Sequence, residues 1–516
     1  MPNGSSIERM KKSHLGWMLL FLILCISSYL QAQNELWGID GSEWTPTSPI
    51  PDFSFAGYHQ GEIEIPNRKV EVSVVDFGAV GDGKTDCSAA FAKAINESGG
   101  RVIGVPPGIY ILSDRIRIEA ENTILKGAGV GETILHFEKG LQEVDPTTST
   151  TGGGVQTNSW SWSGGIITIG TAVGDASPKT PIVKPATRGQ RTLSVQGQGD
   201  LNTEDVFIVQ LIDDTQSSLF KYLYRGRAGD ISLMKGKRFK VSQPIKIEKI
   251  DGTKIHLNRP LRFDVEQRWK PVLLRKKIAA QEIGICDLTI RFPKRKYRGH
   301  WMEDGMNGLQ IQGINNWAKN IRIQNCDSGV FVKGLWNTVD GLIIESKRDE
   351  HSSGNSGHHG ISLQGSDCLI SNFKIRTKFY HDVTVSSSSV GNVFSQGEGI
   401  DLCIDHHRAA PYENLFTQIH VGKGSRVWKS GGSAGKGLHT ASGATFWNID
   451  SEEPFSLPPE DFGPGGLIFV GLNTRSIDRS EIPEGWHFDD IKPGSVQPAN
   501  LYRDQLKHRI NTLPKP

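Results

Sequence analysis

Short segments in which apolar and polar residues alternate recur along the second half of the chain, and glycine begins most of them. They fall at 308–313, 329–334, 360–365, 382–386 and 399–405. A second set of apolar segments lies between them, at 320–324, 339–344, 369–375, 393–394 and 415–421. Repeats of roughly twenty residues, each with two or three short strands, are typical of an all-β solenoid of stacked coils, the parallel β-helix. A β-sandwich is the alternative, but its strands have no reason to repeat one glycine-bounded pattern.

The first strongly patterned stretch of the chain contains an expected helix. Residues 72–86 predict a strand that leads into a glycine-rich turn. Phe91, Ala94 and Ile95 then recur at helical spacing, with Asp86 as the N-cap. Two glycines at 99–100 end this helix, and a series of strands begins at residue 101.

This stretch resembles the opening of the pectate-lyase-like β-helix superfamily. The resemblance rests on the residues Asp76-Phe77-Gly78-Ala79, Gly81-Asp82-Gly83, Thr85-Asp86, Ala90-Phe91, Ala94-Ile95, Val105-Pro106-Pro107-Gly108 and Tyr110. It implies a right-handed parallel β-helix whose first coil is capped by the short helix, because an open end would expose apolar side chains and strand edges. The resemblance does not indicate the reaction, since lyases, hydrolases, epimerases and phage tail spikes are alike here.

The pattern divides the chain into six parts. We expect a signal peptide at 1–33, an extended lead-in at 34–70, and the cap with the first coils at 71–140. The repeat lapses at 141–275, which predicts an inserted β-rich subdomain or elaborated coils. The main β-helix with the active groove is expected at 276–450, and a tail packed on the solenoid at 451–516.

The first residues have the composition of an export signal. Lys11 and Lys12 precede an apolar run from Leu15 to Ile26, and the small residue Ala32 follows. An uncleaved membrane anchor is the alternative, but this run is shorter than the roughly 20 residues that a membrane-spanning helix needs. We expect a secreted or periplasmic protein with no stable membrane span in the mature chain.

Charge and cysteine content exclude several classes of function. The formal net charge is only +2, so no global basic field indicates nucleic-acid binding, and an anionic polymer would need a local groove. Five cysteines lie outside the expected signal peptide, an odd number without a CxxC pair. They therefore give little support to a zinc site or a disulfide framework, and we expect them in the core.

Alternation along the strands predicts which residues leave the core. If Ile400, Leu402 and Ile404 point inward, Asp401, Cys403 and Asp405 point outward. The same argument turns outward a set of polar residues on the neighbouring segments: Asp382, Thr384, Ser386, Lys333, Ser362 and Gln364. Coils stack at about 4.8 Å, so these residues form a polar ladder that suits an extended chain of sugars.

Histidines gather beside this ladder. Five of the fifteen fall between residues 358 and 407, whereas histidines that merely cap turns need not collect on adjoining coils. The candidate catalytic residues are Tyr380, His381, Asp401, Asp405, His406, His407 and Arg408. The candidate substrate-binding residues are Trp301, Lys333, His359, Gln364, Asp382 and Glu398.

The favoured function is a lyase that cleaves an acidic, uronic-acid-containing polysaccharide by β-elimination. His381 or His407 would take the C5 proton, Tyr380 would protonate the leaving oxygen, and Arg408 or a histidine would neutralise the carboxylate. A Ca²⁺ ion on Asp401 and Asp405 is an alternative to the arginine, although no compact carboxylate cluster is evident. No cofactor is otherwise indicated, and the oligomeric state is not determined by the sequence.

Two other functions fit the same groove. A glycoside hydrolase needs two nearby carboxylates, and Asp401 would pair with Asp382 or Glu398, because Asp405 would be about 13 Å along the strand. A non-catalytic glycan-binding adhesin is the third alternative, and the histidine cluster argues against it.

Overall fold

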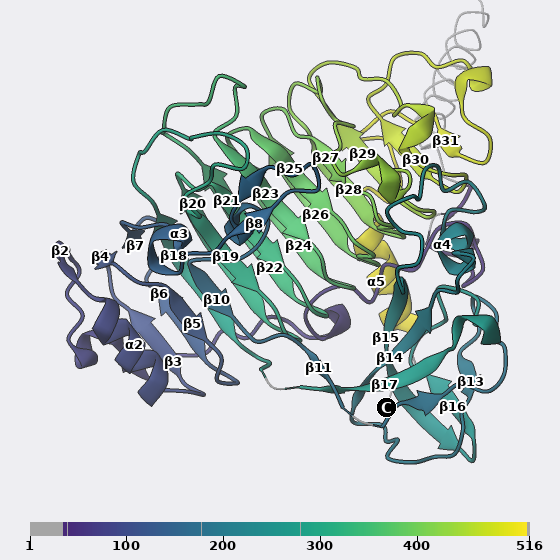
Figure 1. Cartoon of the computed structure of the whole chain (residues 1–516), viewed down its shortest axis with the longest axis horizontal. Coiled ribbons are helices and arrows are strands. Elements are labelled where there is room, and N and C mark those ends of the chain that lie inside the picture. Colours follow the sequence, from purple (N-terminus) through teal and green to yellow (C-terminus); the bar gives the residue numbers. More distant parts are fainter. Residues whose placement is uncertain (1–34, 39, 177, 279, 513–516) are drawn as a thin grey trace, which may run out of the picture.

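Two long parallel sheets form the main body of the protein (Figure 1). The computed structural model describes residues 35–38, 40–176, 178–278 and 280–512, so the expected signal peptide lies outside the described residues. The large sheet has fifteen strands and the small sheet seven. Every pair within these two sheets is parallel, and the all-β parallel β-helix expected from the repeat is confirmed.

The strands of each sheet come from successive coils. The large sheet consists of β1 (Val72–Ser73), β2 (Asp82–Asp86), β3 (Val102–Val105), β4 (Gly108–Leu112), β6 (Ile124–Gly127), β7 (Thr133–Phe137), β18 (Gly284–Arg291), β20 (Trp317–Gln324), β22 (Thr338–Glu345), β24 (Leu369–Ile375), β26 (Val393–Gly399), β28 (Leu415–His420), β29 (Thr445–Asp450), β30 (Ile468–Leu472) and β31 (His487–Asp489). The small sheet consists of β5 (Ile116–Ile118), β10 (Ile167–Ile169), β19 (Asn307–Ile311), β21 (Ser328–Val332), β23 (Gly357–Leu363), β25 (Phe379–Val385) and β27 (Ile404–His406).

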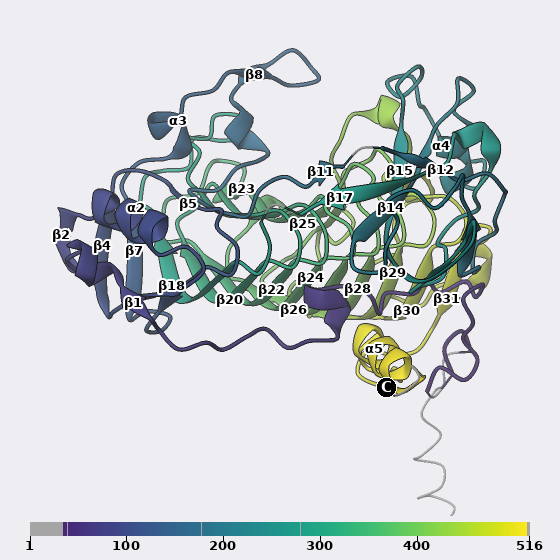
Figure 2. The same cartoon turned by 90° about the horizontal axis from the view of Figure 1, so that it is seen from below.

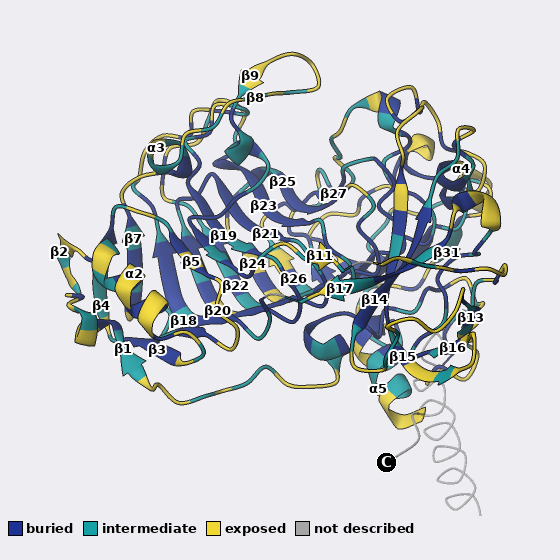
Figure 3. Cartoon of the chain, turned by 60° about the horizontal axis from the view of Figure 1, so that its bottom comes forward, coloured by how far each residue is buried: buried dark blue, intermediate teal, exposed yellow. Residues whose placement is uncertain are grey.

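The core lies between the two sheets and is built by residues in register. In the small sheet Leu309, Val330, Ile361, Val383 and Ile404 stand side by side and are fully buried. Because each coil adds one such residue to the row, the core grows continuously along the solenoid instead of closing on itself. Figure 3 shows these strands in the colour of buried residues, whereas the loops around them are largely exposed.

A row of bulges bends the large sheet. Adjacent strands skip the same position in each ladder, and the residue there has a positive φ. The row contains Asp287, Asn320, Gly341, Asn372, Gln396, Gln418 and Asn448. Asparagine, aspartate and glycine tolerate this backbone conformation better than most residues, which explains their frequency in the row.

A second row of bulges crosses the small sheet. Gly308, Gly329 and Gly360 occupy the position that its ladders skip, and Asp382 occupies it in β25. A Cβ atom at Gly329 would lie 2.5 Å from Cδ1 of a core isoleucine, so this position faces the core. Glycine is therefore needed where the coils are tightly packed.

This second row changes which side chains face outward. Gly360 and the next residue, Ile361, both face the core, so two successive positions point inward and the alternation shifts by one residue. His359 and its ladder partner His381 directly precede the bulge and therefore lie on the outer face. Simple alternation counted back from Ile361 would have placed both histidines inside.

An antiparallel sheet lies beside the solenoid (Figure 2). Its strands are β11 (Gly174–Asp175), β12 (Thr180–Pro181), β13 (Thr192–Ser194), β14 (Val206–Ile212), β15 (Lys240–Asp251), β16 (Lys254–Leu257) and β17 (Val272–Lys277). Together with α4 (Ser218–Leu223) it forms a separate apolar core that includes Ala410 and Tyr412 of the solenoid. This antiparallel sheet is inserted between coils of the solenoid. β10 precedes the sheet in the chain and belongs to the solenoid, and the coils that follow the sheet in the chain belong to the solenoid as well.

Buried ion pairs join the inserted sheet to the coils. Asp367 of the solenoid faces Arg259 at 2.6 Å and Arg262 at 2.8 Å, and Arg262 also contacts Glu413 at 2.8 Å. Asp367 and both arginines are buried. A charge in this position is tolerated only while its partner is present, so these contacts hold the two parts in one relative position.

The remaining elements lie at the ends and the outside of the solenoid. The helix α2 (Ser88–Glu97) lies beside the first strands and buries Phe91, Ala94 and Ile95. The short α3 (Leu141–Val144) precedes an exposed hairpin of β8 (Ser149–Thr150) and β9 (Gln156–Thr157), and α5 (Leu501–Thr512) packs outside the large sheet. Because β30 and β31 continue the large sheet, the solenoid extends beyond residue 450.

Two expectations about the chain can be compared with these elements. The five cysteines of the described residues are buried and free. Across the described ranges, no helix combines the length and hydropathy that a bilayer crossing requires.

Candidate active site

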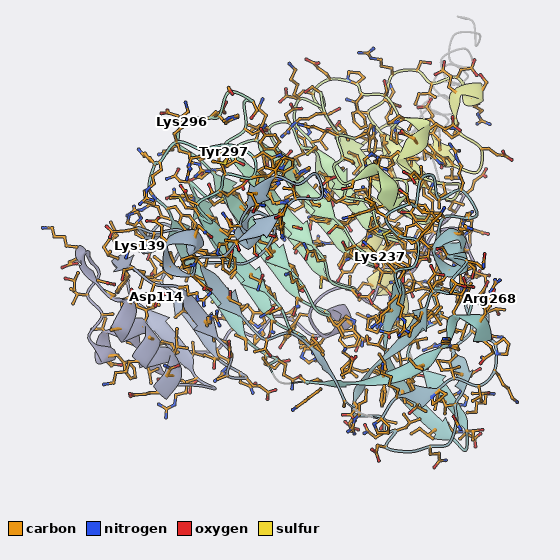
Figure 4. All side chains as sticks on the ribbon, in the orientation of Figure 1. Asp114, Lys139, Lys237, Arg268, Lys296 and Tyr297 are labelled. Carbon is orange, nitrogen blue, oxygen red and sulfur yellow. The ribbon has the colours of Figure 1, made fainter. Side chains whose placement is uncertain are left out.

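Five histidines and two buried carboxylates meet on the outer face of the small sheet. His358 and His359 come from β23, His381 from β25, and His407 follows β27. The fifth, His300, lies in the loop between β18 and β19. Figure 4 labels Tyr297 of the same loop on the solenoid, away from Lys237 and Arg268 on the inserted subdomain.

Asp405 organises two of these histidines. One carboxylate oxygen, Oδ2, lies 3.1 Å from Nδ1 of His381 and 2.9 Å from Nδ1 of His407. The other oxygen accepts a hydrogen bond of 2.7 Å from the backbone N–H of Gly431. Burial alone would raise the pKa of Asp405, but the two imidazoles hold it well below its usual value, so the carboxylate is ionised.

His407 is the more accessible imidazole of this pair. Its side chain is 33% exposed, whereas that of His381 is 10% exposed. Burial alone would lower the pKa of His407, but the charge and the hydrogen bond of Asp405 outweigh burial and raise it. With Nδ1 facing Asp405, the Nε2 atom of His407 remains for another partner.

Tyr380 contacts the imidazole of His300 and the ammonium of Lys429. Its ring stacks on His300 at a centroid separation of 4.6 Å, and Nζ of Lys429 lies 5.6 Å from the same ring. Lys429 is exposed and Tyr380 is half-buried. The loop that carries Lys429 and Gly431 thus covers one side of the site and adds a cation to it.

Glu303 is the second buried carboxylate. Its Oε1 atom lies 3.1 Å from Nδ1 of His358 and accepts a hydrogen bond of 3.0 Å from the Tyr297 hydroxyl. Its Oε2 atom accepts a hydrogen bond of 2.7 Å from the Ser161 hydroxyl. Beyond His358, the Nε2 atom of that ring lies 2.9 Å from Nε2 of His300.

The deeper histidines are neutral at ordinary pH. Burial lowers the pKa of His300 to about 4. Burial, with the neighbouring imidazoles, lowers the pKa values of His358 and His359 well below the usual range. The rings of His359 and His381 stack at 5.1 Å, so two charged imidazoles would repel each other here.

The structure brings together six of the residues that the sequence singled out. His381, Asp405, His407, Tyr380 and His359 form the cluster described above. Trp301 stacks on His300 at 4.2 Å and so borders the same site. Stacked coils bring residues that are distant in sequence to one face, as the repeat predicts.

The predicted role of His406 is wrong. Its ring lies in the core between Phe416, Phe446 and Phe462 and is fully buried. In β27 the side chains alternate, so an outward Asp405 requires an inward His406. Burial lowers the pKa of His406 to about 3.

The expected outward position of Asp382 and the expected inward position of Ile400 are also wrong. Asp382 occupies the inward bulge position, is fully buried, and lies 2.6 Å from Nη2 of Arg426. Residues 399–405 are not one strand, because β26 ends at Gly399 and β27 begins at Ile404. Ile400 lies in the corner between them and is 47% exposed. An inward–outward alternation counted along residues 399–405 therefore assigns Ile400 to the wrong side.

Asp401 lies in the same corner and not on the strand of Asp405. It accepts hydrogen bonds from the N–H and the hydroxyl of Ser425, at 2.9 and 2.8 Å, and faces Arg426. Nitrogen donors surround Asp405. These donors around Asp401 and Asp405 do not fit the oxygen cage that Ca²⁺ prefers.

Two other predicted residues, Glu398 and Arg408, are paired with protein groups outside the cluster. Glu398 is exposed on the large sheet, where it pairs with Lys374 at 2.6 Å. The guanidinium of Arg408 donates to the carbonyl of Gly437 and lies 3.0 Å from Nε2 of His439. It is therefore already engaged by protein atoms.

Lys333 and Gln364 extend the wall on the side of His407. The small sheet pairs Leu363 with Val385 and Val385 with His406. Gln364 directly follows Leu363 and His407 directly follows His406, so the two residues occupy equivalent positions on their coils. Lys333 follows β21 in the same way, and burial lowers its pKa.

Sequence reasoning left out three members of the site. His300, Glu303 and Lys429 lie on loops, where no repeat predicts their neighbours. In the sequence, His300 and Glu303 lie within two residues of Trp301, which was already a candidate substrate-binding residue, and this closeness could have indicated them.

Comparisons with known proteins match part of the chain. Residues 71–167 match the family model described as rhamnogalacturonase A/epimerase, pectate lyase-like. A pre-neck appendage protein of Bacillus phage B103 is 44% identical over 70 residues, which are 14% of this chain and 8% of that protein. Alginate lyase 7 of Azotobacter vinelandii is 39% identical over 83 residues, and the match covers 14% of this chain and 10% of that protein. The chain thus spans about a tenth of the length of these relatives.

Two solved structures are similar over most of the chain. The tailspike protein gp49 of Pseudomonas phage LKA1 has a TM-score of 0.48 at 12% identity, covering 78% of this chain and 62% of that chain. The A-module of the mannuronan C-5 epimerase AlgE6 of Azotobacter vinelandii has a TM-score of 0.37 at 12% identity, covering 82% and 91%. Scores at this level carry no argument about activity.

Proposed function

We propose that the chain, whose residues 71–167 match a pectate-lyase-like family model and whose fold is a parallel β-helix, is a lyase that cleaves a uronic-acid-containing polysaccharide by β-elimination. The observation that carries the proposal is the pairing of His407 and Asp405 beside Tyr380 and Lys429. The export indicated by residues 11–26 would bring such an enzyme to polymers outside the cytoplasm.

His407 is the proposed base. Asp405 holds its Nδ1 atom at 2.9 Å, which selects the tautomer whose Nε2 atom accepts a proton. The C5 proton of the uronate passes to Nε2, and its electron pair forms the C4–C5 double bond. The C4–O4 bond then breaks, and the leaving oxygen takes a proton.

Tyr380 and Lys429 supply the other two requirements. The Tyr380 hydroxyl donates the proton to the leaving oxygen, and the Lys429 ammonium lies over its ring. A cation beside the uronate carboxylate stabilises the charge that develops when C5 loses its proton. We assign this role to Lys429 instead of Arg408, because the Arg408 guanidinium is held by Gly437 and His439.

The carboxylates of the site favour elimination over hydrolysis. Hydrolysis of a glycoside needs two carboxyl groups that reach the scissile bond. Asp405, Glu303 and Asp382 are buried and bound to protein donors. Glu398, the alternative partner of Asp401, lies on the other sheet.

The test is an assay of the full chain against alginate, polygalacturonate and glucuronan, with ultraviolet absorbance of the unsaturated product as the readout. His407→Gln and Tyr380→Phe should each lower kcat by roughly 10²–10⁴-fold, and Lys429→Ala should mainly raise KM. The control is His420→Gln, because His420 also faces an aspartate, Asp450 at 3.4 Å, but on the large sheet. New reducing ends without the chromophore, or full activity of His407→Gln, would contradict the proposal.

A further inference from the structure

Three imidazoles converge without a carboxylate among them. One ring nitrogen from each of His300, His358 and His381 lies within 4.8 Å of the others. The shortest of these approaches is 2.9 Å, between the two Nε2 atoms of His300 and His358. Two nitrogens bound to one tetrahedral zinc ion at 2.0–2.1 Å stand roughly 3.3 Å apart, so a small opening of this pair would admit an ion.

A buried carboxylate stands behind two of the three rings. Nδ1 of His358 faces Glu303 at 3.1 Å, and Nδ1 of His381 faces Asp405 at 3.1 Å. Histidines that bind a metal commonly use the second ring nitrogen in this way, since the carboxylate sets the tautomer and makes the ligand more basic. Each of these two rings therefore keeps Nε2 for an ion.

The carboxylates are themselves held in place. Glu303 accepts hydrogen bonds from Tyr297 at 3.0 Å and from Ser161 at 2.7 Å, and Asp405 accepts one from Gly431 at 2.7 Å. Such contacts orient a carboxylate before any ion is bound. The arrangement is a built site and not a chance meeting of side chains.

We propose that His300, His358 and His381 bind one zinc ion, with Glu303 and Asp405 as the carboxylates that orient the ligands. Imidazole nitrogens suit zinc, whereas Ca²⁺ and Mg²⁺ take oxygen ligands. Three protein ligands leave the fourth position of a tetrahedral ion for water or a substrate oxygen. Zinc binding does not rest on the proposed lyase activity; if both hold, the ion adds positive charge beside Tyr380, whose ring stacks on His300.

The test measures metal and not turnover. The full chain is stripped with a chelator and titrated with Zn²⁺ by calorimetry, and the bound metal is counted after dialysis. We expect one zinc ion per chain, and a visible spectrum of a tetrahedral site when Co²⁺ replaces it. His300→Gln and His358→Gln should each weaken binding at least 100-fold, and Glu303→Gln, at a positioning residue, by 10–100-fold.

His420→Gln is the matched control and should bind zinc as the unchanged chain does. A folded chain that takes up no stoichiometric zinc, or a His358→Gln variant that binds zinc equally well, overturns the site. The lyase proposal is judged separately, because His407→Gln should keep its zinc while losing turnover. Zinc binding without any unsaturated product would leave the metal site standing and remove the lyase.

Discussion

The backbone of Gly431 covers the imidazole of His407 so closely that a Cβ atom at Gly431 would lie 2.6 Å from Cε1 of His407. The same atom would lie 2.7 Å from Cε1 of His381. The Gly431 N–H also donates to Asp405, so this one glycine contacts Asp405 and both of the histidines that face it. The loop over the small sheet therefore sets the space in which both imidazoles can move.

Replacing Gly431 by alanine should lower kcat without unfolding the protein. The added methyl group displaces the rings of His407 and His381, and a misplacement of about 1 Å can cost on the order of 100-fold in rate. The measurement is turnover together with the thermal unfolding midpoint. Gly153→Ala is the control, since the nearest atom to a Cβ there, within the described part of the chain, is Thr151 Oγ1 at 3.9 Å. Unchanged kcat in Gly431→Ala would show that the imidazoles do not act where we place them.

The charge of Asp405 should be essential although its side chain is buried. Asp405→Asn keeps the shape, but it removes the acceptor that orients His381 and His407. We expect turnover to fall on the order of 10²–10⁴-fold, with little change in circular dichroism. Asp450→Asn, at the exposed aspartate that faces His420, should keep normal turnover. Equal losses in both variants would point to a general effect of removing charge.

His406 should make the protein unstable in acid. Burial lowers its pKa from the ordinary 6.5 to about 3, and neither ring nitrogen has a hydrogen-bond partner among the described residues. The unfolded chain therefore binds the proton first as pH falls from about 6.5 to about 3. Over this window the free energy of unfolding should fall by about 1.4 kcal/mol for each pH unit because of this one group. Above pH 6.5 the group should not change the free energy of unfolding.

His406→Phe tests this pH dependence. A phenyl ring fits between Phe416, Phe446 and Phe462 and cannot take up a proton. Urea unfolding measured at several pH values should give the variant a shallower loss of stability below pH 6.5 than the unchanged chain. Identical slopes would mean that His406 is not buried as a neutral ring.

The buried ion pairs between the inserted sheet and the coils should dominate the stability of their junction. Asp367→Asn leaves Arg259 and Arg262 short of a counter-charge in a buried position. We expect a loss of about 3–5 kcal/mol in the free energy of unfolding, measured with urea. The exposed pair of Arg191 and Glu248 is the control, and Glu248→Gln should cost less than about 1 kcal/mol. A small loss in Asp367→Asn would show that the junction relaxes around the unpaired arginines.

The repeat predicted the solenoid because each coil of a parallel β-helix requires the same short pattern of apolar and polar residues. Each coil needs its own apolar row, so residues such as Leu309, Val330 and Ile361 are visible as a pattern before any contact is known. The same stacking predicted that the coils of His381 and Asp405 would adjoin. The outward direction of His381 does not follow from periodicity, because it depends on the bulge at Gly360 and Asp382.

Local irregularities in the strands explain why simple alternation predicted the wrong direction for some side chains. The bulge at Gly360 and Asp382 shifts the alternation by one residue, and the corner at 400–403 interrupts the expected strand. Neither is visible in a count of apolar and polar residues, because a bulge depends on how two adjacent strands pair.

By itself, the sequence determined the solenoid, its core rows and the adjoining coils that carry His359, His381 and Asp405, because these depend on a repeat that every coil must satisfy. Only the tertiary structure decided that His359 and His381 face outward beside a bulge, and that His300, Glu303, Lys429 and Gly431 complete the site. The last four residues come from loops that no repeat constrains. Their positions result from packing between segments far apart in the chain, which a local pattern does not contain.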